Sequence, residues 1–135
     1  MIQTKYNDAT HNRPDGERVI DANFVFSDLP AYAEQIKGEK SWVEGDRNAI
    51  TVFKSPQMTI TLMAMKNGAK VEDSQSDNFI SIQVIAGGIH IQGTDMDFEV
   101  GERHIISLHP GIKHSFEALK ESLLLLTTLG EQVVR

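Results

Sequence analysis

The stretch 68-GAKVEDSQSDNFISIQVIAGG-88 contains a polar run, an apolar segment and a closing pair of glycines. The apolar segment, FISIQVIA at residues 79–86, is rich in β-branched and aromatic side chains. Such residues fit the pleated surface of a sheet, and glycines mark the turns at which strands end. The stretch therefore predicts a β-strand with a turn at each end.

Segments of the same kind follow one another from about residue 47 onward, separated by turns that contain Gly or Pro. They read NAITVFK, MTITLMAM, FISIQVIA, IHIQ, MDFEV, RHIISL, KHSFEAL and SLLLLTTL. Short strands broken every few residues by such turns are typical of antiparallel sandwiches and barrels. We expect a mostly β fold, a β-barrel of jelly-roll type. The last segment is apolar at successive positions, which indicates a strand covered on both faces.

The N-terminal residues predict an arm that precedes a single domain. Residues 1–17 are polar and contain the turn signal Pro-Asp-Gly at positions 14–16. We therefore expect an arm over residues 1–17 and one barrel domain over residues 18–135. The arm could be mobile or could pack on a second subunit.

One short helix is expected at about residues 28–38, in the segment SDLPAYAEQIKG. Ser27 or Asp28 can cap its N-terminus, Pro30 fits the first turn and Gly38 suits the end. Its apolar residues recur at helical spacing and would form one packing face. These residues are Leu29, Tyr32, Ala33 and Ile36.

Composition restricts the classes of function. At 135 residues with 40% hydrophobic and 24% charged residues, the chain has the size and composition of one globular domain. It has no cysteine, so disulfides and thiolate metal sites are excluded. The net charge of −6 disfavours nucleic-acid and anionic-membrane partners. Without a secretory signal or a long apolar run, a cytoplasmic location is expected.

The glycine spacing of the opening stretch resembles the first motif of the cupins. That motif reads Gly, five residues, His, one residue, His, three or four residues, Glu, six residues, Gly. Gly68 and Gly88 stand at its two ends, and the three metal-ligand positions fall on Ser74, Ser76 and Ser81. Serine hydroxyls are poor ligands for a divalent ion compared with imidazole nitrogens.

The segment GERHIISLHPGIKHSFEA resembles the second cupin motif, in which a histidine ligand follows a Pro-x-Gly turn. Gly101, Gly111 and His114 match it, whereas His109 stands where proline is expected and Ala118 where asparagine is expected. There are also two additional residues after Gly101. The two motifs lie within residues 68–118, and the resemblance to small RmlC-like cupins covers about residues 47–129.

The resemblance implies a cupin-like barrel whose motif residues face a common interior. We therefore expect a small-molecule-binding protein that recognises a polar ligand in the lumen, with no metal and no cofactor. Strand alternation adds two residues to the motif positions as lumen residues. The expected lumen site comprises Ser74, Ser76, Ser81, Gln83, His114 and Phe116. No catalytic residue can be assigned.

Two other functions stay open at this point. One is a metal-dependent cupin enzyme of oxygenase or isomerase type with an unusual ligand set that includes His114, drawn from the histidines at positions 90, 104, 109 and 114. The other is a structural or dimerisation module in which large side chains fill the barrel. Because an open barrel has edge strands to protect, and cupins often pair through them, a homodimer is also expected.

Overall fold

The computed structural model describes residues 4–130 of the chain, which form eleven strands and two helices. The helices are α1 (Leu29–Lys37) and α2 (Lys40–Glu44). The strands are β1 (Lys5–Asn7), β2 (Arg18–Asp21), β3 (Arg47–Lys54), β4 (Met58–Met65), β5 (Lys70–Ser74), β6 (Phe79–Ala86), β7 (Gly88–Gly93), β8 (Met96–Gly101), β9 (Ile105–Leu108), β10 (His114–Ala118) and β11 (Ser122–Leu129). No helix within this range is long and apolar enough to cross a membrane.

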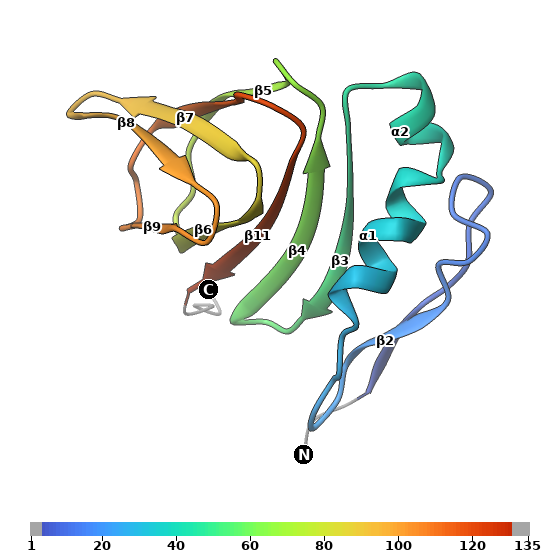
Figure 1. The fold of residues 1–135 in the computed structure, drawn as a ribbon. Coiled ribbons are helices and arrows are strands. Elements are labelled where there is room, and N and C mark those ends of the chain that lie inside the picture. Colours follow the sequence, from blue (N-terminus) through green and yellow to red (C-terminus); the bar gives the residue numbers. More distant parts are fainter. Residues whose placement is uncertain (1–3, 131–135) are drawn as a thin grey trace.

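Two antiparallel sheets face each other and form the barrel (Figure 1). The larger has the strand order β3-β4-β11-β6-β9 and the smaller the order β5-β10-β7-β8. Non-consecutive strands are neighbours in both sheets, as in a jelly roll. The expected mostly β jelly-roll fold is therefore confirmed. Strand β5 was not expected, because its sequence KVEDS is charged and lacks the apolar alternation of a half-buried strand.

The helices cover one side of the larger sheet. Helix α1 lies against β3 and β4 (Figure 1), with Asp28 accepting a hydrogen bond from the Ala31 amide as its N-cap and Gly38 at its C-terminus. The predicted apolar face of this helix is confirmed, because its residues pack on the outer side of the sheet. A second helix, α2, follows at once and buries Trp42 in the same layer. It was missed because it is a single short turn.

The N-terminal arm forms a hairpin with the start of the predicted domain. Strand β1 pairs with β2, so the pairing crosses the expected boundary at residue 17. The division into arm and domain stays a prediction, and residues 1–3 and 131–135 of the two segments lie outside the described range. Strand β2 contacts β3, the edge strand of the larger sheet.

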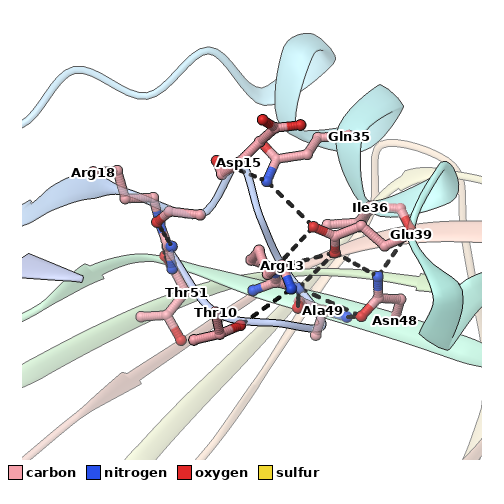
Figure 2. Close-up of polar contacts among 11 residues, drawn as sticks. Thr10, Arg13, Asp15, Arg18, Gln35, Ile36, Glu39, Asn48, Ala49 and Thr51 are labelled. Carbon is pink, nitrogen blue, oxygen red and sulfur yellow. Dashed lines mark hydrogen bonds and ion pairs between the residues drawn. The ribbon is translucent and has the colours of Figure 1, made fainter. Parts of the chain in front are cut away.

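Two arginines of the arm region bind the backbone of this edge strand (Figure 2). Arg13 donates to the Ala49 carbonyl oxygen, and Arg18 donates through Nε to the Thr51 carbonyl oxygen at 3.0 Å. Arg13 also pairs with Glu39, whose carboxylate lies 2.9 Å from Nη2. Unpaired backbone groups on an edge strand invite pairing with other chains, and the two guanidinium groups satisfy two carbonyl oxygens of β3 here.

The space between the two sheets is filled by apolar side chains. Both sheets contribute to one buried cluster that includes Ile82, Val84, Ile91, Phe116 and Leu124. Strand β11 separates this cluster from the layer beneath the helices: Leu124 lies inside the barrel, while its neighbours pack on the outer side. The prediction that the segment SLLLLTTL is covered on both faces is confirmed.

Ser122 ties the start of β11 to the turn between β6 and β7. Its buried hydroxyl accepts a hydrogen bond from the Gly88 amide at 3.0 Å and lies 2.8 Å from the Lys120 carbonyl oxygen. Ser122→Ala would leave a buried amide without its partner, so we expect a loss of about 1–2 kcal/mol of unfolding free energy. Urea denaturation checks this, with exposed Ser107→Ala as a control that should change stability by less than about 0.5 kcal/mol. Equal losses in the two variants would contradict the assigned role.

Candidate ligand site at the mouth of the barrel

His114 is a buried histidine at the first position of β10. Its side chain is almost inaccessible, with 3% of the residue's surface exposed. The imidazole Nδ1 lies 3.0 Å from the Ile112 carbonyl oxygen. A carbonyl oxygen only accepts hydrogen bonds, so Nδ1 carries the hydrogen and Nε2 of the neutral ring has the lone pair. The ring is held in one orientation, with one acceptor directed away from its own loop.

Two of the expected site residues lie beside His114. Ser74 is its backbone partner on β5, and Phe116 follows two residues later with its ring parallel to the imidazole at a centroid distance of 6.4 Å. Phe116 is buried in the barrel cluster. The structure therefore brings the first and second motifs together at the pairing of β5 with β10.

Ser76 belongs to the loop after β5 and makes local backbone contacts. Its hydroxyl accepts a hydrogen bond from the Asn78 amide at 3.0 Å, and its carbonyl oxygen accepts one from Gly111 at 2.7 Å. Serine commonly stabilises turns through this pattern. The hydroxyl of Ser76 thus has a structural partner in the loop.

The expectation that Ser81 and Gln83 face the lumen is corrected by the structure. Ile80, Ile82 and Val84 of β6 pack in the barrel cluster, and successive residues of a strand point to opposite faces. Ser81 and Gln83 therefore lie on the outer face, where Gln83 is exposed. The motif count ended on Gly88; a count that ends on Gly87 gives Ile80 instead. A shift of one residue reverses every side chain of a strand.

An open hollow lies where β5, β10 and the β7–β8 hairpin meet, and its volume is about 540 Å³. Its lining combines the buried imidazole with carboxylates, an amide, two hydroxyls and one ammonium group. The lining residues are Asp73, Gln92, Gly93, Thr94, Asp95, Met96, Asp97, Lys113, His114 and Ser115. Of these residues only His114 was among the expected site residues, because the hairpin carries no motif and the motif position in β5, Ser74, is not part of the lining.

The residues present do not fit a three-ligand metal site. Across residues 4–130, no group of three or more His, Asp or Glu side chains is arranged to hold a metal ion. His90 instead pairs with Asp97 at 2.6 Å, and His109 packs against the ring of Phe79. Catalytic metal sites of the zinc type ordinarily need three protein ligands.

Comparison by sequence identifies no relative: no family model matches the chain, and no curated protein matches it. Comparison by structure finds many similar folds. A cupin superfamily protein from Desulfitobacterium hafniense is 14% identical with a TM-score of 0.61, and the match covers 63% of this chain and 78% of that one. The Cnp3 cupin domain of Schizosaccharomyces pombe is 14% identical with a TM-score of 0.66, and the match covers 96% of this chain and 84% of that one.

Enzymes also appear among the similar structures. Salicylate 1,2-dioxygenase from Pseudoaminobacter salicylatoxidans is 12% identical with a TM-score of 0.55, and the match covers 62% of this chain and 26% of that one. Other similar structures are RmlC-like cupins, and one is a protein of unknown function. At these identities the likeness shows the fold alone. The chain has the cupin fold, which enzymes and proteins of unknown function share.

Proposed function

We propose that this protein binds a small polar molecule at the mouth of the barrel, in the hollow beside His114. The observation that carries the proposal is the buried imidazole, whose Nδ1 hydrogen is donated to Ile112. An imidazole fixed in this way offers a single directed acceptor. A small-molecule site needs a few polar groups whose positions are set by the fold.

The charges around the hollow select the class of ligand. Asp73, Asp95 and Asp97 face it together with a single ammonium group, that of Lys113. Lys113 Nζ lies 3.8 Å from Asp73 Oδ1, so part of its charge is already balanced. Excess negative charge repels anions and favours hydrogen-bond donors. The ligand that fits is a neutral, hydroxyl-bearing molecule or a small amine, rather than a carboxylate or a phosphate.

The packing of the barrel supports a site at the mouth rather than deep in the lumen. Large apolar side chains such as Ile82, Ile91 and Leu124 are fully buried between the sheets. Native interiors are close-packed and leave little free volume. The polar groups on which the proposal rests lie at one end of this packed interior.

The same packing favours a second candidate function, that of a structural module with a filled barrel. Apolar side chains from both sheets form one continuous cluster, as a scaffold requires. The two candidates differ in one respect: a scaffold has no need for a small ligand at His114. A homodimer stays a prediction from the sequence under either function.

Ligand-observed NMR with three matched groups of probes tests the proposal. The groups are neutral monosaccharides and polyols, small amines, and the corresponding sugar acids. We expect binders in the first two groups and none among the acids. His114→Gln should weaken the binding of each hit by about tenfold in calorimetry, because one hydrogen bond is lost.

Two further variants keep the result interpretable if the buried substitution disturbs folding. Lys113→Ala alters the exposed rim of the hollow and should change affinity without loss of the fold. His104→Gln replaces an exposed histidine outside the hollow and should leave affinity unchanged. Hits that bind all variants equally, or no hits at all, would favour the structural module.

A further inference from the structure

A second hollow adjoins the one beside His114, on the outer face of the smaller sheet. Its volume is about 310 Å³, and it is lined mainly by polar residues of β5, β7 and β10. Asp73, Gln92 and Ser115 line both hollows. The two hollows therefore form one continuous polar groove, which begins at His114 and crosses the sheet.

Strand alternation explains the polar floor of this groove. His90 and Gln92 of β7 alternate with isoleucines that are buried in the barrel cluster. Ser115 and Glu117 of β10 flank the buried Phe116 in the same way. Because successive residues of a strand point to opposite faces, all four polar side chains lie on the outer face. Ser115 is the cross-strand partner of Gln92. Glu117 is the partner of His90, so two polar pairs lie next to each other along the groove.

Negative charge predominates in the polar groove. Five carboxylates and two ammonium groups line the two hollows, which leaves an excess of three negative charges when the histidines are neutral. The carboxylates are those of Glu72, Asp73, Asp95, Asp97 and Glu117, and the ammonium groups are those of Lys70 and Lys113. The carboxylates are spread over β5, β10, β8 and the turn between β7 and β8 rather than gathered at one point. Such a groove attracts a cation whose charges are also spread out.

His114, which is 3% exposed, provides an independent indication that the groove takes a ligand. Every enclosed side-chain nitrogen or oxygen among the described residues has a hydrogen-bond partner. Nε2 of His114 has no such partner within residues 4–130, because the hydrogen bond of this ring is that of Nδ1 with the Ile112 carbonyl oxygen. Nε2 is therefore not enclosed by protein, and it reaches solvent through the hollow that His114 lines. A buried imidazole with one open acceptor suits a hydrogen-bond donor such as an ammonium group.

We infer that the ligand of this groove is a linear polyamine, with one ammonium group at His114 and the others beside the carboxylates along the sheet. The inference rests on the function proposed above and narrows its class of ligand. Asp97 on β8 and Glu117 on β10 belong to strands that lie on either side of β7. These strands are two strand spacings apart, about 10 Å. A triamine is long enough to reach both carboxylates, whereas a monoamine or a monosaccharide occupies one hollow and leaves the other without a partner.

Isothermal titration calorimetry of the full-length chain with butylamine, 1,4-diaminobutane and spermidine tests the inference. Affinity should rise along this series, and spermidine should bind about tenfold more tightly than butylamine, because each added ammonium group meets a further carboxylate. Glu117→Gln removes a carboxylate that lines the second hollow alone. It should therefore weaken the binding of spermidine about threefold and leave the binding of butylamine unchanged. Raising the salt concentration should weaken spermidine more than butylamine.

Glu102→Gln is the matched control, because Glu102 is exposed and lies outside both hollows. It removes the same charge from the molecule and should leave the affinity for spermidine unchanged. Circular dichroism verifies that both variants fold. Equal losses in the two variants, or spermidine that binds no more tightly than butylamine, would overturn the inference. The proposed site would still stand if butylamine or a polyol binds in a way that depends on His114. Failure of every amine and every polyol to bind would contradict the proposed site as well.

Discussion

Gly87→Ala is expected to lower the free energy of unfolding by roughly 3 kcal/mol or more. Gly87 joins β6 to β7 with φ at +92°, a conformation that costs other residues about 1–2 kcal/mol. A Cβ there would also lie 2.6 Å from the Glu121 carbonyl oxygen and against the Ser122 hydroxyl. Strand β11 would have to move where Ser122 fixes it.

Substitutions at two other glycines distinguish the cost of backbone strain from the cost of a steric clash. Gly111 and Gly68 have φ values of +84° and +85°, and an added Cβ would meet nothing within 4 Å at either position. Alanine at either position should lower the free energy of unfolding only by the cost of the positive φ angle, about 1–2 kcal/mol. Urea denaturation of the three variants at one protein concentration makes the comparison. Equal losses at all three positions would show that the close approach to β11 is unimportant.

Glu39→Ala is expected to lower the free energy of unfolding by about 2–3 kcal/mol. The Glu39 carboxylate accepts hydrogen bonds from Arg13, Asn48 and Gln35, and it joins the arm to α1 and β3 (Figure 2). Its removal leaves the guanidinium of Arg13, which is 21% exposed, without a counter-ion. The loss is smaller than for a fully buried pair because water reaches Arg13.

The exposed pair of Lys37 with Glu121 serves as the control for this prediction. Glu121 is 59% exposed, and Glu121→Ala should cost less than about 1 kcal/mol. The combined variant Arg13→Met/Glu39→Met removes both charges and should recover part of the loss seen in Glu39→Ala. No recovery in the combined variant would show that the ion pair is not the source of the stabilisation.

The contribution of Glu39 should also depend on pH. Burial alone would raise the pKa of Glu39, but hydrogen bonds from Arg13 and Asn48 and the charge of Arg13 outweigh it, so this pKa lies below its usual value. A carboxyl group with a lowered folded-state pKa stabilises the protein above its unfolded pKa of about 4.3. This stabilisation is lost as the pH falls through the folded-state value. The stability difference between wild type and Glu39→Gln should therefore shrink at acid pH.

Local sequence determines most of the fold. The segment MTITLMAM alternates between apolar and polar residues over most of a strand, and the last strand begins with a continuous apolar run. Helix α1 has an N-cap, a proline in its first turn and one apolar face, which together mark its start and its packing side. The glycines of the opening stretch are explained by the backbone: Gly68 and Gly87 need positive φ whatever the site contains. The glycine spacing of a metal-binding motif can therefore be present in a chain that lacks the metal ligands, because the turns themselves require glycine.

The candidate site was less predictable, for two physical reasons. Side-chain direction depends on strand register, and the count from Gly88 assigned the outward Ser81 and Gln83 to the lumen where Ile80 and Ile82 lie. The hollow itself depends on long-range pairing that places Asp73 and the β7–β8 hairpin beside His114. His114 was identified because it follows Gly111 at the spacing of the second cupin motif.

A ¹⁵N-labelled NMR titration of the wild type with the best neutral or amine hit, repeated on His114→Gln, locates the ligand site residue by residue. The largest shifts should fall on His114, Lys113 and Asp73, and the variant should bind about tenfold more weakly. Shifts confined to another part of the molecule, or equal affinity in the variant, would contradict a ligand site at the mouth of the barrel.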